Sequence, residues 1–169
     1  MSKPVDEHSR KIRLSLEEWC QLAKEGITVP ITTPLRWISM EPMIRVNRDP
    51  VTFIPVSRDL IPGDVVLFKR QDGAYVCHRV YKILDKGKTI LTWGDNAERP
   101  DEPIPRSAVF GLAVSYERDG KHIILDSDEQ RKKGLKWLKS KWKRLAFVKY
   151  RELRHKLGDA ARERGLLKE

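Results

Sequence analysis

Four residues of types that perform acyl-transfer chemistry stand in order along the chain: Ser39, His78, Asp95 and Asp101. A serine hydroxyl is a poor nucleophile until a base takes its proton, and an imidazole can take that proton at neutral pH. A carboxylate fixes the imidazole tautomer and stabilises the cation that forms. These residue types predict nucleophilic catalysis, with Ser39 as nucleophile, His78 as general base and one of the two aspartates as the orienting acid.

Each of these residues also has a plain structural interpretation. Ser39 could be a turn or cap serine, and His78 could be a histidine packed inside a strand. Asp95 and Asp101 could be ordinary loop acids. Cys77 precedes His78, but neighbours in a strand face opposite ways, so we expect only one of the two at a site and choose His78.

The segment that must position these residues reads as mainly β. Runs of apolar or alternating residues are separated by short turns that contain glycine, with almost no helix between them. This pattern predicts a small all-β barrel or coiled sheet. Residues 27–31 resemble an edge or irregular extended run, since prolines interrupt them, and residues 94–107 resemble a loop. The expected strands are 52–56, 65–69, 75–84, 89–93, 108–117 and 122–125.

Helices are expected on both sides of this β segment. Ser15 and Glu18 have capping-box spacing, so we predict a helix over 15–25 that ends before Gly26, preceded by a flexible leader over 1–13. In the tail, the residues Leu135, Leu138, Trp142, Leu145 and Ala146 recur at helical spacing and predict one apolar stripe, with Gly158 before a last short helix. The chain thus divides into units 1–26, 27–128 and 129–169.

Four short pieces carry a family resemblance: Ser39-Met40-Glu41-Pro42, Pro62-Gly63-Asp64 with the apolar strand after it, His78-Arg79-Val80, and Gly94-Asp95-Asn96 with Asp101 downstream. Their order and spacing resemble the archaeal and endoplasmic-reticulum branch of the signal peptidase family. The bacterial branch and the self-cleaving SOS repressors have lysine in place of this histidine. The resemblance covers roughly residues 35–115. It implies the signal-peptidase type of coiled sheet and a Ser39–His78–Asp101 triad, with Asp95 as the alternative third member or as a structural carboxylate.

The sequence departs from that family in three places. Trp37-Ile38 stands where the family has Ser-Gly before the nucleophile, so a hydroxyl donor to the oxyanion is missing and the Ser39 backbone N–H remains. Losing one such donor can cost about 10²–10³ in rate. Arg48-Asp49 replaces the usual Gly-Asp, and no membrane-spanning segment is expected.

The positive charge of the chain is concentrated in its tail. Residues 129–169 hold 15 Lys and Arg and 5 Asp and Glu, which accounts for the whole net charge of +10. A helix with this composition can lie on an anionic membrane surface, pack its stripe on the barrel, or bind nucleic acid. We favour the membrane surface. Residues 1–38 offer one helix, too little for a helix-turn-helix, so nucleic acid is the least favoured partner.

The sequence as a whole predicts a serine endopeptidase that cleaves leader or signal-type segments of a peptide or precursor protein. The alternative is a catalytically inactive module that has the peptidase fold and binds peptides or an anionic membrane surface. With no secretory signal recognised, we expect a cytoplasmic chain, peripheral on the membrane if the tail binds lipid. Cys20 and Cys77 are expected to be reduced thiols, and no metal or organic cofactor is indicated.

Overall fold

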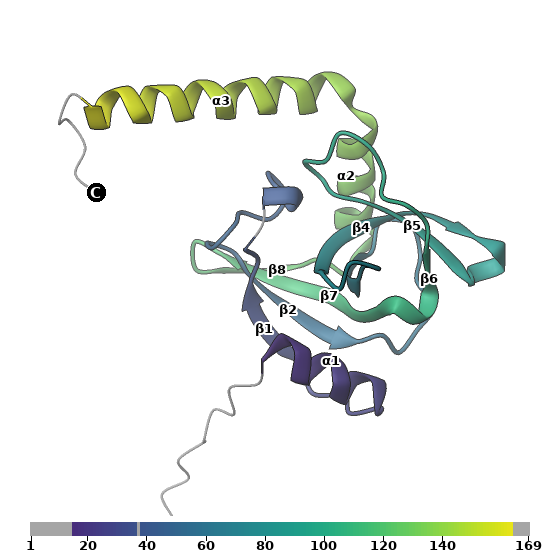
Figure 1. The fold of residues 1–169 in the computed structure, drawn as a ribbon. Helices are drawn as coiled ribbons and strands as arrows, with labels where there is room; N and C mark the ends of the chain where they lie inside the picture. The colour runs from purple at the N-terminus through teal and green to yellow at the C-terminus, as the bar shows by residue number, and fades with distance from the viewer. Residues whose placement is uncertain (1–14, 37, 164–169) are drawn as a thin grey trace, which may run out of the picture.

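A computed structural model describes residues 15–36 and 38–163, apart from the side chains at 155 and 158–163. Its centre is one coiled antiparallel sheet with strand order β1-β2-β7-β3-β4-β5-β6, and β8 pairs with β7 (Figure 1). The mainly β fold class is thereby confirmed. The strands are β1 Ile31–Pro34, β2 Pro50–Pro55, β3 Val65–Lys69, β4 Tyr75–Leu84, β5 Thr89–Trp93, β6 Ile104–Pro105, β7 Val109–Arg118 and β8 Lys121–Ile124.

The expected strands agree closely with the observed ones. β3, β4 and β5 have the predicted bounds, while β2, β7 and β8 shift by one or two residues. The edge strand expected near 27–31 is present with later bounds: the paired strand β1 starts at Ile31 and lies at the sheet edge. The predicted loop 94–107 contains the short strand β6, because buried Ile104 pairs with Ile90 of β5.

The coiled sheet has apolar side chains on both faces, which form two clusters. Helix α1 (Leu16–Lys24) covers one face, and the Ser15–Glu18 capping box is present, as predicted. Trp19 of α1 is almost fully buried and donates from Nε1 to the Val29 carbonyl at 2.7 Å. Its ring packs so closely on Gly111 of β7 that a Cβ there would lie 3.0 Å away. The expected leader, 1–13, lies outside the described residues.

The tail forms two separate helices, and its apolar residues do not make one continuous stripe. Helix α2 spans Asp128–Lys139 and helix α3 spans Lys141–Glu163, with a break at Ser140. The predicted single stripe is wrong because the break turns its two halves apart: Leu138 is 2% exposed, whereas Trp142 is 84% exposed. Gly158 was expected to precede a separate helix, but it lies inside α3.

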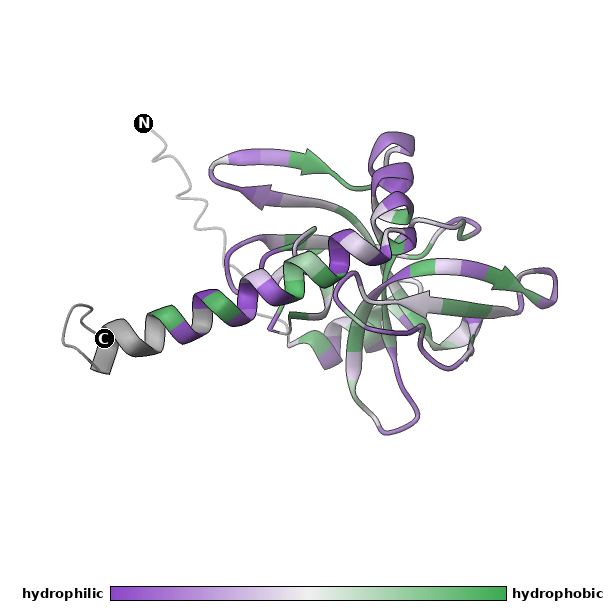
Figure 2. Cartoon of the chain, turned by 90° about the horizontal axis from the view of Figure 1, so that it is seen from above, coloured by the Kyte–Doolittle hydropathy of each residue, from purple (hydrophilic) through white to green (hydrophobic). Residues whose placement is uncertain are grey.

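Helix α2 packs against the β unit. Helix α3 extends away from it (Figure 2). Gly134 of α2 lies against the Arg79 guanidinium of β4, and a Cβ on Gly134 would come within 2.1 Å of Arg79 Cζ. Trp137 donates from Nε1 to the Asp95 carbonyl at 2.7 Å. Arg131 pairs with Asp64 and Asp126. The basic stretch therefore begins on a helix that belongs to the packing of the β unit. No helix among the described residues is long and apolar enough to cross a membrane.

Replacing Gly134 by alanine tests this packing. In an exposed helix the change would favour folding by up to about 1 kcal/mol. Here the added methyl would displace the Arg79 side chain, so we expect Gly134→Ala to lower the free energy of unfolding by about 1–3 kcal/mol. Urea titration would measure it. Lys133→Ala, at the exposed neighbouring position, is the control, and equal stability of both variants would contradict the close contact.

Candidate active site

His78 of β4 and Asp101, which follows β5, form a close pair. Strand β4 carries His78, which is 6% exposed, and its Nδ1 lies 2.6 Å from Asp101 Oδ2. Asp101 lies beyond β5, and its backbone N–H donates to the Thr92 carbonyl at 2.9 Å. The Thr92 hydroxyl donates to the same carboxylate oxygen at 2.6 Å. With Nδ1–H directed at Asp101, His78 Nε2 is left as the proton acceptor.

The surroundings of Asp101 favour its charged form. Burial alone opposes ionisation, but the hydrogen bond and charge of His78 and the bond from Thr92 hold the pKa of Asp101 below its usual range. An ionised carboxylate at this place keeps the proton of the imidazole on Nδ1 and stabilises an imidazolium. The pair therefore has the electrostatics that a general base requires.

Ser39 lies near the His78–Asp101 pair, on a different segment of the chain. It lies in a short 3₁₀ helix, η1 (Ile38–Met40), and is partly exposed. A Cβ at Gly94 would lie 2.9 Å from both His78 Nε2 and the Ser39 carbonyl oxygen. Only glycine leaves room for both groups, so Gly94 brings the main chain of η1 next to the imidazole.

Ser39 and His78 also line a common hollow of about 280 Å³. Its other lining residues are Arg70, Ala74, Tyr75, Val76 and Cys77. Within the described residues, Ser39 Oγ makes no hydrogen bond to His78. Such bonds are often long in ligand-free enzymes and shorten when substrate binds.

The segment Gly94-Asp95-Asn96 holds η1 in place. The Asn96 backbone N–H donates to the Ser39 carbonyl at 2.8 Å, and the Asn96 side-chain amide donates to the Ile38 carbonyl at 3.2 Å. Each residue of this motif thus has a separate part. Gly94 permits the close approach, Asn96 fixes the main chain beside the serine, and Asp95 ties the segment to the sheet.

Asp95 serves the fold and does not contact His78. Its two carboxylate oxygens accept from Arg79 Nε and Nη2 at 2.9 and 2.7 Å, and both side chains are fully buried. Arg79 completes its bonding at the Gly63 carbonyl, 2.9 Å away. Of the two candidates for the third role, the structure thus places Asp101 beside the imidazole and Asp95 in a buried ion pair.

Cys77 is a poor candidate for a nucleophile. It borders the hollow beside Ser39, but it is 5% exposed and belongs to the core cluster that contains Trp19. Burial raises the pKa of its thiol well above the usual range, so a thiolate at neutral pH is disfavoured.

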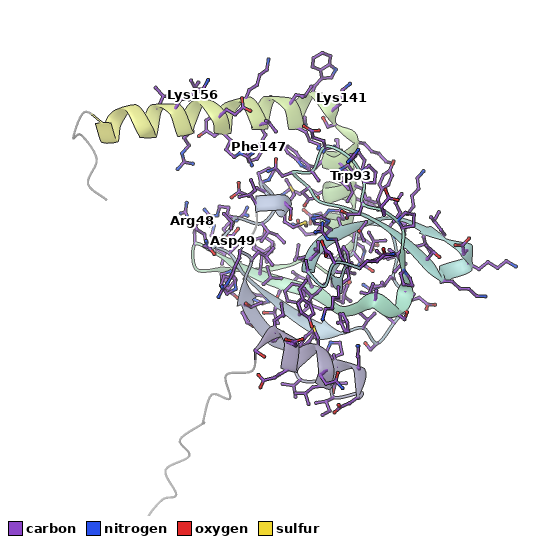
Figure 3. All side chains as sticks on the ribbon, viewed as in Figure 1. Arg48, Asp49, Trp93, Lys141, Phe147 and Lys156 are labelled. Atoms are coloured by element: carbon purple, nitrogen blue, oxygen red, sulfur yellow. The ribbon has the colours of Figure 1, made fainter. Side chains whose placement is uncertain are left out.

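The places where the sequence departs from the signal peptidases have distinct structural outcomes. Asp49 of the Arg48-Asp49 pair is fully buried and accepts hydrogen bonds from Arg45 and Arg118 (Figure 3). It therefore holds the segment after η1 to strand β7. Trp37 lies outside the described residues, and Ile38 beside it is 45% exposed.

Sequence reasoning missed two supporting residues. Thr92 is fully buried and donates a hydrogen bond to Asp101, and nothing in its local sequence marks it among the other strand threonines. Trp137 of α2 lies in the basic tail and was not proposed as a site residue, yet it donates to the Asp95 carbonyl. Among the described residues, no three His, Cys, Asp or Glu side chains gather so that they could hold a metal ion.

Comparison with protein-family models, with curated proteins and with solved structures finds no match to the chain. The resemblance to the signal peptidases therefore rests on the four motifs quoted from the sequence.

Replacing each of the two aspartates by asparagine should lower the free energy of unfolding by different amounts. Asp95→Asn leaves the buried Arg79 guanidinium without its counter-charge, so we expect a loss of about 3–5 kcal/mol in the free energy of unfolding. Asp101→Asn removes the charge of a partly buried carboxylate, and we expect a loss of about 1 kcal/mol in the free energy of unfolding. Urea unfolding followed by far-ultraviolet circular dichroism measures both. A larger loss for Asp101→Asn would reverse the assigned roles.

Proposed function

We propose that the chain is a serine endopeptidase resembling the signal peptidases, which cleaves leader or signal-type segments of a precursor. The observation that carries the proposal is the 2.6 Å contact between His78 Nδ1 and Asp101, with Nε2 turned to Gly94 and the Ser39 main chain. This arrangement brings the Ser39, His78 and Asp101 segments together, although Ser39 lies 39 residues before His78 and Asp101 lies 23 residues after it.

The reaction assigned to these groups is a two-step acyl transfer. Ser39 Oγ attacks the scissile carbonyl carbon while His78 Nε2 takes the hydroxyl proton, and Asp101 stabilises the imidazolium. His78 then gives this proton to the leaving amine, and an acyl-enzyme ester remains on Ser39. A water molecule, deprotonated by Nε2, hydrolyses the ester and releases the acid. The Ser39 backbone N–H is the proposed donor to the oxyanion.

The sheet offers an open backbone edge for an extended substrate. Strand β5 pairs with β4 only from Arg79 onward, whereas β3 pairs with β4 from Tyr75. Residues Tyr75 to Cys77 of β4 therefore have no β5 partner among the described strands. The same residues line the hollow beside Ser39. A peptide could add there as a strand, with its backbone bonded to β4. The 280 Å³ hollow would then take side chains next to the scissile bond.

The test uses a fluorophosphonate probe and a panel of leader-containing precursors, followed by intact mass spectrometry. We expect the probe to label Ser39 and one precursor to be cut at a single site. Ser39→Ala and His78→Ala should each lower the cleavage rate by at least about 10³-fold. Ser57→Ala removes an exposed serine outside the site and should leave cleavage unchanged.

The alternative function is separated by the same experiment. A folded protein whose Ser39 does not react with the probe, and which binds a precursor without cutting it, would be the inactive peptide-binding module. Labelling that is equal in the parent chain and in His78→Ala would show that the imidazole does not activate the serine, and it would overturn the proposed mechanism.

A further inference from the structure

Helix α3 exposes an apolar stripe that the rest of the described chain does not cover. Steps of 4, 4, 3 and 4 residues place its five members within an arc of about 80° on the helix. These are Trp142, Ala146, Tyr150, Leu153 and Leu157, all exposed. Trp142 is 84% exposed and Leu157 is 63% exposed. So many neighbouring apolar side chains in water mark an interaction surface.

The other side of α3 makes the contacts with the body. Phe147 packs edge-on against Trp137 of α2, with the ring centroids 6.1 Å apart. Arg144 stacks over Trp93 of β5, with its Cζ atom 4.6 Å from the ring centroid. Figure 3 shows Phe147 on the side of α3 that faces the sheet. Because this side serves the internal contacts, packing of the tail on the barrel does not account for the stripe.

Basic side chains border the stripe along both of its edges. Lys149 and Lys156 lie within about 40° of one edge, and Lys143 and Arg154 lie within about 40° of the other. All four are exposed. Over residues 141–157 the sequence has seven Lys and Arg and a single acidic residue, Glu152.

We propose that this face of α3 binds an anionic lipid surface. The apolar stripe would enter the boundary between headgroups and acyl chains, with Trp142 at the depth that tryptophan prefers. The flanking lysines and arginines would meet the lipid phosphates. Pairing with a second copy would bring seven like charges against seven. Nucleic acid would engage the charges and leave the stripe in water. The inference does not depend on the proposed peptidase activity.

The test measures binding of the full chain to vesicles by co-sedimentation and by the blue shift of tryptophan emission. The vesicles are equimolar phosphatidylglycerol and phosphatidylcholine, or phosphatidylcholine alone. We expect binding to the anionic vesicles that weakens with added salt. Trp142→Phe should remove most of the emission shift while binding persists.

Two double variants separate the apolar and the basic contributions. Leu153→Ser with Leu157→Ser should weaken binding at least about tenfold. Lys149→Gln with Lys156→Gln should weaken it about 30-fold, because each basic residue near an anionic surface contributes a factor of about five. Lys88→Gln with Lys121→Gln removes the same charge from exposed positions on the β unit and is the matched control. All substituted residues are exposed, so circular dichroism should show unchanged folding.

Three results would overturn the proposal: vesicles left unbound, equal binding to both vesicle types, or binding that neither α3 double variant weakens. If the vesicles stay unbound, sedimentation velocity of the leucine variant shows whether the stripe joins two copies. An oligonucleotide shift assay of the lysine variant then shows whether the charges bind nucleic acid.

Discussion

A buried ion pair connects the main parts of this molecule. Arg79 is 1% exposed, and a guanidinium at that depth must find acceptors for its donors or it would destabilise the fold by several kcal/mol. It finds two oxygens on Asp95 and the Gly63 carbonyl, and Gly134 of α2 closes over it. Strand β4, the turn before β3, the segment after β5 and the first tail helix therefore meet at one side chain.

The ion pair also determines where the candidate site lies. His78 and Arg79 are neighbours in β4 and leave the strand on opposite faces. On one face Arg79 holds Asp95, which fixes the segment that contains Gly94 and Asn96. On the other face His78 lies against that same segment and reaches Asp101. One strand thus positions the imidazole directly and positions Ser39 through the bonds that Asn96 makes to η1.

Local sequence signals predicted the parts of the fold that depend on local interactions. The bounds of β3, β4 and β5 follow from apolar runs that end in glycine turns, and α1 follows from its capping box. The break at Ser140 was not predicted, because no glycine or proline marks it and the helical spacing continues across it. Leu138 is 2% exposed and Trp142, four residues later, is 84% exposed, a difference that the continuous spacing does not predict.

The site shows the same division between local and distant information. Residue type and motif order singled out Ser39, His78 and both aspartates. The separate positions of the aspartates depend on which basic side chain lies nearby in space, and the sequence alone ranked Asp101 first only through a family resemblance. Thr92 is one threonine among several in strands, so nothing in its local sequence distinguished it from a residue that merely packs.

The break between α2 and α3 makes the direction of the exposed stripe depend on the number of residues at the junction. Because α2 is seated on the sheet, the junction at Ser140 sets the rotation of everything after it. One residue inserted or deleted there would change the rotation of α3 relative to α2 and carry Trp142 away from its present direction. A one-residue change in length at Ser140 would therefore redirect the exposed stripe of α3 without altering any of its residues.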